Sequence, residues 1–549
     1  MTEATLERPT FSLISQPWIP CLGMDGAVKE YSLLEVFKEA KQLKAIAAEL
    51  PITDFALLRL CLAIVYAAHR DKTLDTELWA EWFEEGLPVD NIERYFEEQS
   101  DYFDLFHPET PFFQVAGLRN SKDERFGLER LILDVPAGAP FMTTRIGEGL
   151  ESISYSEGAR ALVTLQSFDV SGIKTGAVGD PRVKGGKGYG IGPGWTGRLG
   201  GVFFEGINLH DTFMLNLVGT HPGSGDRWTN DAPAWETFHW TAGDAQAAVN
   251  SDIEATGPQA LYTWQNRRVR LFPEDGVIKH VIVAQGDPLA PQNMFELEPM
   301  SGWRNSPAQQ KALKSSVPVY MPREHDPARM LWRNVGSLLP TERNNTSTEE
   351  RFKSSESSEW LGELYLDAML PHDYPVRLHG VGLAYGSQQA VVDELYDDVV
   401  SGQLATFAST SQHVQQAINN AIEASEQAVL ALRNLAANIA TSKGLGVEGP
   451  REEASTLAYA TLDAPFREWF SRVTPENIEE LLPEWVERAL SLIMAIGLDM
   501  TARAVSISFF GREHQERRYN APLSEAWFRS ALAKIRKSFI SPTNTEERA

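Results

Sequence analysis

Cysteine is almost absent from this chain, with only Cys21 and Cys61 among 549 residues. Two cysteines exclude a disulfide framework and a cysteine zinc site, and they are typical of a reducing compartment, so we expect a cytoplasmic location. No run of about 18 apolar residues occurs, and residues 1–10 have neither the basic nor the apolar region of a secretory signal. We therefore expect no membrane span and no signal peptide.

Recognisable catalytic motifs are also lacking. The 11 histidines form no H-x-x-x-H pair, no G-x-S-x-G elbow occurs, and no acidic cluster of the nuclease kind stands out. His107 has Asp104 and Glu109 nearby, but these residues flank a proline-containing turn, and aromatic side chains docking the loop on a core explain it better. The sequence predicts a protein that is not an enzyme and holds no metal or cofactor, although dispersed catalytic residues would leave no motif.

Basic residues are scarce relative to acidic ones, and the formal net charge is −25. This balance argues against indiscriminate nucleic-acid binding. A local basic groove remains compatible with it, because salt screens exposed charges beyond about 8 Å. One stretch differs from the rest: residues 171–201 contain a single acid, Asp180, and five bases. The bases are Lys174, Arg182, Lys184, Lys187 and Arg198.

Within this basic stretch, nine of the seventeen residues from Gly185 to Gly201 are glycine. Glycine reaches positive φ and lets another molecule approach the backbone, but ordering it costs entropy. The sequence also contains a G-x-G-x-x-G pattern, without the strand and helix of a dinucleotide site, and a Gly-Lys pair without the Ser or Thr of a phosphate-binding loop. The pattern comprises Gly192, Gly194 and Gly197.

Two interpretations of the glycine-rich stretch remain. A flexible linker is one, since glycine-rich chains are flexible by default. Linkers rarely carry aromatic residues such as Trp195 and Tyr189, however. We favour a loop that approaches the sugar-phosphate groove of a nucleic acid. Its candidate phosphate contacts are Lys184, Lys187 and Arg198.

Two later segments have related features. Residues 261–271, LYTWQNRRVRL, place Arg267 and Arg268 next to aromatic residues, which suits contact with phosphates and bases; the alternative is a strand with a solvated face. Residues 376–392 read as an apolar strand that ends at Gly386. Gln388 and Gln389 then stand at a tight turn before a predicted helix, which they could simply cap.

The composition predicts an α+β protein with two domains. Residues 1–394 form a large mixed α/β domain, with a hairpin near the start and a buried helix from Thr53 to His69. In that helix Cys61 is expected to be a core thiol. Residues 395–549 form a four-helix bundle, because helical periodicity runs from Val414 to Leu435 and recurs in three later segments. Those segments are roughly 452–472, 475–496 and 523–538.

Several stretches taken in order resemble one family. They are SQPWIPCL with a following Ser-Leu-Leu helix, PFFQV, GRLGGVFFEGINLHDTFMLNL, TWQNRRVRL, DPARMLWR, the GSQQA turn and the helical carboxyl terminus. The chain resembles the large subunit, CasA, of the type I-E CRISPR surveillance complexes known as Cascade. The resemblance covers nearly the whole chain, and its collinear order is more specific than any one motif.

This resemblance implies a function. Family members are non-catalytic; they recognise the protospacer-adjacent motif (PAM) of double-stranded DNA in the minor groove, help to open the duplex and form the R-loop, and help to recruit a helicase-nuclease. It also implies guide RNA and the other Cascade subunits as partners. Some members carry a cysteine zinc site, whose cysteines this chain lacks, so no metal is expected.

The resemblance also implies roles for particular residues. The family's glycine segment that lies at the PAM falls on Gly192–Gly197, which includes Gly194, Trp195 and Thr196. The lysine that accompanies it in the minor groove falls on Lys279. The wedge that enters the duplex falls on Gln389, with Gln388 and Gly386 supporting its turn. A loop that contacts the guide and target falls on residues 137–145, with Phe141, Thr143 and Arg145 as its candidate contacts.

Two rival functions remain open. One is a carbohydrate- or nucleotide-active enzyme that binds its substrate with the glycine-rich loop. The other is a scaffold without DNA contact. Catalytic activity of the isolated chain would favour the enzyme. A DNA affinity that is unchanged when the charges of the loop are reversed would favour the scaffold.

Overall fold

The computed structural model of the chain describes residues 8–135, 143, 145, 151–220, 228–237, 254–340 and 351–540. The fold divides into two compact units. Unit 1 comprises Met1–Arg329, Thr346–Pro371 and Val376–Val399, and unit 2 comprises Met330–Asn345, His372–Pro375 and Val400–Ala549. The boundary predicted at 394/395 therefore lies five residues before the division at 399/400, and both fall within one strand. Two earlier segments belong to unit 2, because contacts between distant segments leave no mark in local composition.

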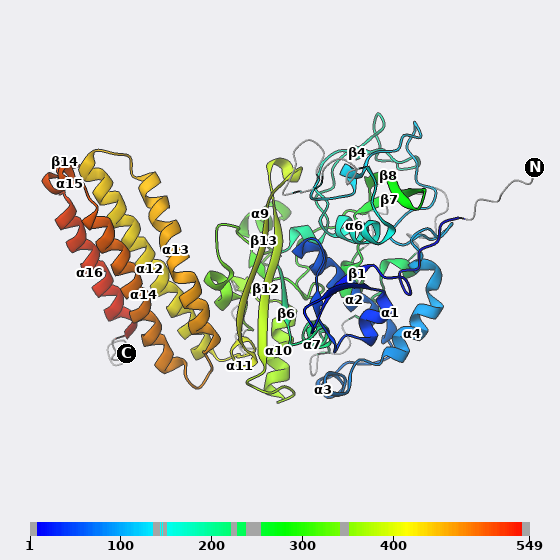
Figure 1. The fold of residues 1–549 in the computed structure, drawn as a ribbon, viewed down its shortest axis with the longest axis horizontal. Helices are drawn as coiled ribbons and strands as arrows, with labels where there is room; N and C mark the ends of the chain where they lie inside the picture. Colours follow the sequence, from blue (N-terminus) through cyan, green and yellow to red (C-terminus); the bar gives the residue numbers. More distant parts are fainter. Residues whose placement is uncertain are drawn as a thin grey trace, which may run out of the picture. The chain divides into compact units, whose positions relative to one another are not determined.

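Unit 1 mixes short helices with small sheets (Figure 1). Its helices are α1 (Leu33–Lys38), α2 (Pro51–Ala68), α3 (Thr76–Glu85), α4 (Val89–Glu98), α6 (Tyr155–Phe168), α7 (Leu209–Asn216), α8 (Pro258–Tyr262), α9 (Pro307–Leu313) and α10 (Glu356–Leu366). Two of its sheets have the strand orders β2-β1-β3 and β10-β9-β11. These strands are β1 (Ile19–Gly23), β2 (Val28–Tyr31), β3 (Leu43–Ile46), β9 (Trp303–Asn305), β10 (Tyr320–Pro322) and β11 (Phe352–Lys353).

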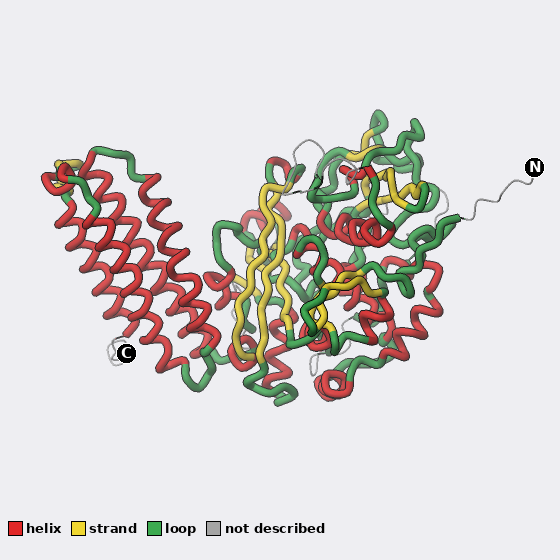
Figure 2. The backbone as a smooth tube through the Cα atoms, viewed as in Figure 1, coloured by secondary structure: helices red, strands yellow, loops and turns green. Residues whose placement is uncertain are grey.

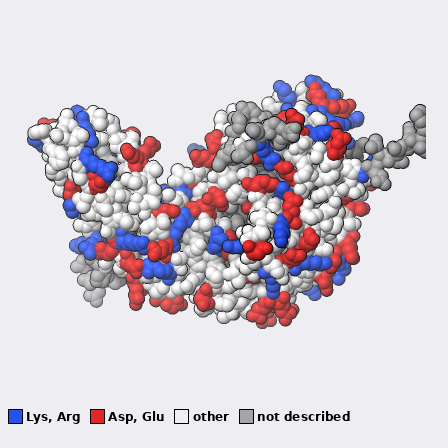
Figure 3. All heavy atoms as spheres, viewed as in Figure 1, with Lys and Arg blue, Asp and Glu red and all other residues white. Residues whose placement is uncertain are grey.

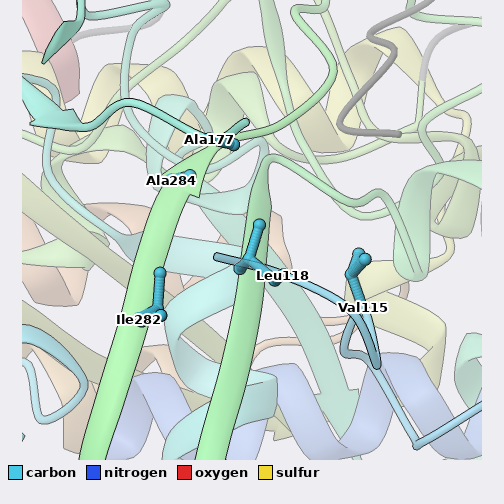
Figure 4. Packing of buried hydrophobic residues seen from close by; sticks show 5 residues of the cluster. All are labelled: Val115, Leu118, Ala177, Ile282 and Ala284. Carbon is cyan, nitrogen blue, oxygen red and sulfur yellow. The ribbon is translucent and has the colours of Figure 1, made fainter. Parts of the chain in front are cut away.

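The two other sheets of unit 1 carry the segments predicted to touch DNA. Their strand orders are β5-β4-β8-β7 and β13-β12-β6. The strands are β4 (Lys174–Thr175), β5 (Lys187–Gly188), β6 (Gly201–Glu205), β7 (Arg267–Glu274), β8 (Val277–Gln285), β12 (Pro375–Tyr385) and β13 (Val392–Gln403). β12 and β13 run side by side as a long hairpin (Figure 2). Apolar residues of β8 and of neighbouring segments form a small buried cluster at the first of these sheets (Figure 4). They are Val115, Leu118, Ala177, Ile282 and Ala284.

α2 is a core helix of unit 1, as predicted. Pro51 occupies its first turn, where a missing N–H breaks no hydrogen bond, and apolar residues surround the rest. The helix has the length and mean hydropathy, 1.6, of a membrane span, but 78% of it is buried inside the protein, as befits a core helix. Cys61 is fully buried, and His69 at the helix end bonds two backbone carbonyls at 2.8 and 3.3 Å. The interpretation of Cys61 as a core thiol is confirmed, and His69 lies at the carboxyl end of the helix.

Unit 2 contains the predicted bundle. Four long helices pack together, and they are α12 (Gln412–Lys443), α13 (Glu448–Ser471), α14 (Ile478–Ala502) and α16 (Ala521–Ile540). Trp469 and Trp485 are fully buried between them, and the Trp485 indole donates to the hydroxyl of Ser425 at 3.0 Å. The α+β class with a helical carboxyl-terminal region is confirmed. Short elements that we did not predict accompany the bundle: α11 (Leu404–Phe407), α15 (Ser506–Phe510), β14 (Arg512–His514) and β15 (Arg517–Tyr519).

Two helical glycines of the bundle give a matched test of its packing. A methyl group at Gly497 would lie 2.3 Å from the Phe528 ring, whereas one at Gly449 would meet no atom within 4 Å. We expect Gly497→Ala to lower the free energy of unfolding by about 1–3 kcal/mol. Gly449→Ala, at an exposed position in the first turn and next to Pro450, should change it by no more than about 0.5 kcal/mol. Urea titrations of the full chain check both, and equal stability of the two variants would contradict this packing.

Candidate nucleic-acid interface

A five-residue segment, Phe168–Gly172, contacts both of the segments that the sequence predicts to touch DNA. We call it the connector; it begins at the last residue of α6 and leads into β4. Its backbone is bonded to the end of β12, to the turn that carries the two glutamines and to the glycine-rich stretch. The bonds run from the Tyr385 hydroxyl to the Phe168 carbonyl (2.7 Å), from the Ser171 amide to the Gln389 carbonyl (2.7 Å) and from the Gly194 amide to the Asp169 carbonyl (2.9 Å).

The connector is fixed by a buried ionic cluster. The Asp169 carboxylate is paired with the ammonium of Lys174 at 2.7 Å and with the guanidinium of Arg267. Arg267 also donates to the carbonyls of Val170 and Gly192, both at 2.9 Å. Burial by itself would raise the pKa of Asp169, but the charges of Lys174 and Arg267 outweigh it and hold that pKa below its ordinary value.

Arg267 and Arg268 are therefore not phosphate contacts, contrary to the prediction. Both guanidiniums are buried, and that of Arg268 forms two 2.9 Å bonds with the Asp287 carboxylate. The alternative of a solvated strand face is also wrong, because β7 is buried where these arginines lie. Sequence shows that arginines alternate with apolar residues in β7. It does not show that Asp169 and Asp287 come from other segments to pair with them.

The glycine-rich stretch has two parts with opposite exposure. Residues 184–187 and 189–190 are exposed, whereas residues 193–197 are buried. The structure thus places Trp195 in the interior, where its indole donates to the Glu298 carboxylate at 2.6 Å, and that carboxylate also pairs with Arg59. A Cβ at Gly194 would lie 2.3 Å from the Ser167 carbonyl, so this glycine serves internal packing.

The prediction that DNA touches Gly194, Trp195, Thr196 and Gly197 is corrected accordingly. All four residues are buried, so the residues of this stretch that a second molecule can reach lie earlier in the chain. We call residues 184–192 the glycine loop. Gly192 at its end is partly exposed, has a φ of +100°, and is held from behind by Arg198.

The glutamine turn, residues 387–390, is a hairpin turn between β12 and β13. The helix predicted after Gln389 is wrong: β13 follows and pairs with β12, and its residues Val392, Tyr396 and Val400 are buried while Asp393 and Glu394 are exposed. Gln388 and Gln389 have φ values of +54° and +56°, and the Ala390 amide bonds the Ser387 carbonyl at 3.1 Å. Positive φ at both central residues matches the primed turns of β-hairpins, which normally use Asn and Gly.

The strained turn presents both glutamines to solvent. Each left-handed non-glycine residue costs about 1–2 kcal/mol, and neither side chain forms a hydrogen bond to any described residue. Gly386 precedes them because a Cβ there would lie 2.4 Å from the Asp393 carboxylate. The backbone bond between Gln389 and Ser171 holds the turn beside the glycine loop, whose Gly190 adjoins Ser171.

The candidate cations differ in their availability. Lys184 and Lys187 are exposed and form no ion pair with any residue that the structure describes. Arg198 is partly buried and donates to the Ile191 carbonyl at 2.9 Å, so it shapes the glycine loop from behind. On the face drawn in Figure 3, acidic and basic residues are interspersed.

Lys279 does not join the glycine loop. Its ammonium pairs with Asp275 at 2.8 Å near the turn between β7 and β8. The other end of β8, at Gln285, bonds the Gly188 carbonyl of the loop at 3.4 Å. Six residues of strand separate the two points, or about 20 Å.

The predicted guide-contacting loop is described only in part. Phe141 lies outside the described residues. Arg145 pairs with Asp134 at 3.3 Å and with Glu157, and its amide bonds the Thr143 hydroxyl at 3.1 Å. Within this structure Arg145 is thus engaged by two carboxylates of its own chain.

The described residues contain no group of three or more His, Cys, Asp or Glu side chains that could hold a metal ion. Two cavities of about 250 and 400 Å³ are lined by other segments, such as those around Tyr66 and Trp264, and not by the glycine loop. The exposed features beside the connector are a pair of lysines, bare backbone and two strained glutamines. This set suits contact with a polyanion better than a reaction.

Comparison with known proteins identifies the family. The family model described as CRISPR-associated protein Cse1 matches residues 12–496. The chain belongs to the Cse1 family. A curated relative, CasA/Cse1 of Thermus thermophilus, is 27% identical over 499 residues, which cover 86% of this chain and 89% of the relative.

Solved structures agree with this assignment. The crystal structure of Thermobifida fusca Cse1 is 40% identical, with a TM-score of 0.86, and the match covers 96% of this chain and 98% of that one. A chain of a CRISPR RNA-guided surveillance complex has the same fold at 18% identity, with a TM-score of 0.63 and coverage of 89% and 100%. The resemblance drawn from the sequence is confirmed at the level of family and fold.

Sequence reasoning missed the residues that assemble the interface. The connector carries no motif, and Gln285, whose side chain bonds the Gly172 and Gly188 carbonyls, looks like any polar residue at a strand end. One signal was present: Asp169 is an isolated acid that stands just before the basic stretch of residues 171–201. An acid in that position is a candidate counter-ion for buried bases.

The ionic cluster predicts a pH-dependent loss of stability. Asp169→Asn leaves Lys174 and Arg267 buried without a counter-charge, which should lower the free energy of unfolding by about 3–5 kcal/mol at pH 7. Because the folded pKa of Asp169 is lowered, its contribution is complete above about pH 4 and is lost as the pH falls through the folded value. The difference between wild type and variant should therefore vanish only below pH 4.

Urea titrations at several pH values measure this difference. Asp275→Asn is the matched control, because its carboxylate is exposed and, among the described residues, its ion-pair partner is the partly exposed Lys279. The control should unfold at the same urea concentration as the wild type. An Asp169→Asn variant as stable as the control at pH 7 would contradict a structural role for the cluster.

The free energy of unfolding should rise when residues suited to positive φ replace the two glutamines of the turn. Replacing Gln388 by Asn and Gln389 by Gly installs residues that accept positive φ, so the free energy of unfolding should rise by about 1 kcal/mol. The glutamine side chains are lost in the same variant. Thermal unfolding measures the gain, and an unchanged or lower stability would show that the turn is not strained.

Proposed function

We propose that this chain is the PAM-recognising subunit of a type I-E CRISPR surveillance complex and acts on double-stranded DNA without catalysing a reaction. The observation that carries the proposal is the bond between the Ser171 amide and the Gln389 carbonyl, since it holds the glutamine turn beside the glycine loop. Membership of the Cse1 family supports it, as does the shared fold with a chain of an RNA-guided surveillance complex.

In this proposal the glycine loop contacts the minor groove next to the PAM. The exposed backbone at Gly185 and Gly186 fits a narrow groove, and Lys184 and Lys187 contact the flanking phosphates. The minor groove distinguishes mainly A·T from G·C pairs, so such a reader accepts several related PAMs. Lys279 is a second proposed contact, about 20 Å away, which is the length of roughly six base pairs of duplex.

The glutamine turn acts as the wedge. Unstacking a base step costs a few kcal/mol, and an exposed Gln389 side chain, held rigidly by its hairpin, offsets part of that cost by bonding disrupted base edges. Guide RNA then pairs with the opened strand and supplies sequence specificity. The partners proposed are the target duplex, the guide RNA, the other Cascade subunits and a helicase-nuclease recruited to the R-loop, all in the cytoplasm.

Binding of a reconstituted, guide-loaded complex to duplexes with randomised PAMs tests the proposal. Affinity falls as salt rises, and replacing a lysine that contacts a phosphate should make the slope of log affinity against log salt less steep by about 0.9. Lys187→Ala and Lys279→Ala are therefore compared with Lys311→Ala, a control at an exposed lysine. Gln389→Ala should slow opening of duplex targets and spare targets that are already open.

The outcomes separate the parts of the proposal. PAM-dependent binding that survives omission of this chain overturns the proposed function. Binding lost on Lys187→Ala but not on Lys279→Ala restricts the contact to the glycine loop. Turnover of a sugar or nucleotide by the isolated chain would instead favour the enzyme that the sequence left open.

A further inference from the structure

An apolar pair of side chains lies directly beside the glutamine turn. Ile173 and Tyr189 are 57% and 56% exposed, in contrast to the buried aromatic residues that fill unit 1. Among the described residues, Tyr189 forms no ring contact and no side-chain hydrogen bond. Neither its packing nor its hydroxyl therefore explains why an aromatic ring stands in this exposed loop.

The register of two short strands brings this pair together. β4 and β5 are antiparallel, with Lys174 opposite Gly188 and Thr175 opposite Lys187. Continued one step beyond these two pairs, the register sets Ile173 against Tyr189. The backbones remain close one step later, because a Cβ on Gly190 would lie 3.0 Å from the Gly172 amide. Residues opposite each other in such a ladder project from the same face, with Cβ atoms about 4.5–5.5 Å apart.

The pair is joined to the wedge by the connector. Ser171, two residues before Ile173, donates its amide to the Gln389 carbonyl at 2.7 Å. A Cβ on Gly172 would lie 3.9 Å from that of Ala390. The side-chain amide of the buried Gln285 donates hydrogen bonds to the carbonyls of Gly172 and Gly188, at 2.8 and 3.4 Å, and so links the two segments. The apolar pair therefore has a fixed position relative to the glutamines.

We propose that Ile173 and Tyr189 form a stacking site for a nucleobase that the glutamine turn displaces from the duplex. The ligand class follows from the surroundings: an aromatic ring backed by an aliphatic side chain receives the flat face of a base, and Lys184 and Lys187 in the same loop attract its phosphates. Stacking on an aromatic ring tolerates any base, which suits a target of arbitrary sequence. The inference rests on the proposed function and extends it to the fate of the first opened base.

2-Aminopurine placed at the first base pair next to the PAM, on either strand in turn, tests the site in the guide-loaded complex. Its fluorescence rises when the base leaves the duplex and is quenched when it stacks on a ring. We expect quenching with the wild type and with Tyr189→Phe. Tyr189→Ala should give a bright signal and duplex opening at least about fivefold slower. Val317→Ala, at an equally exposed apolar position, is the matched control and should behave as wild type.

An abasic nucleotide at the same position separates the loss of base stacking from other effects of the substitution. With no base to stack, wild type and Tyr189→Ala should open the target at equal rates. A wild-type rate and signal in Tyr189→Ala, an equal defect in Tyr189→Phe, or a difference that persists with the abasic target each overturns the stacking site. Absence of PAM-dependent opening in the wild type, by contrast, overturns the proposed function, and the inference falls with it.

Discussion

The buried carboxylate of Asp169 is the interaction on which the interface depends. It pairs with both Lys174 and Arg267, which would otherwise be charges without a counter-charge in the interior of unit 1. Through Arg267 it fixes the carbonyls of the connector and of Gly192. The exposed loops on either side are therefore held by groups that solvent does not reach. Such preorganisation lowers the entropy lost when a flexible loop binds its target.

The glycine-rich stretch shows how one composition serves two purposes. At Gly194 the missing side chain lets the backbone approach Ser167 inside the fold, whereas at Gly185 and Gly186 the bare backbone faces solvent. Composition cannot separate these uses, because both require the absence of a Cβ. Burial separates them. A ligand can reach only the second kind, and this moves the proposed contact toward the start of the stretch.

The excess of acidic over basic residues is consistent with a nucleic-acid contact that is confined to one loop. With a net charge of −25, the chain as a whole repels nucleic acid, and two lysines of one loop, which form no ion pair with any described residue, provide a local exception. Repulsion elsewhere disfavours unspecific binding, so a duplex approaches in few orientations. The strained glutamines fit the same arrangement, because a turn of Asn and Gly would be more stable and would offer no long side chain to the duplex.

The sequence by itself determined the buried helix α2, the helical bundle, the lack of a cysteine framework and the family. These depend on local periodicity, composition and collinear order, all of which are read along the chain. Only the tertiary structure decided which residues face a partner. Arg267, Arg268 and Trp195 look like binding residues in sequence, yet Asp169, Asp287 and Glu298, far away along the chain, meet them in the interior. Pairing between distant segments sets burial, and burial decides whether a charged or aromatic residue stabilises the fold or remains free to bind.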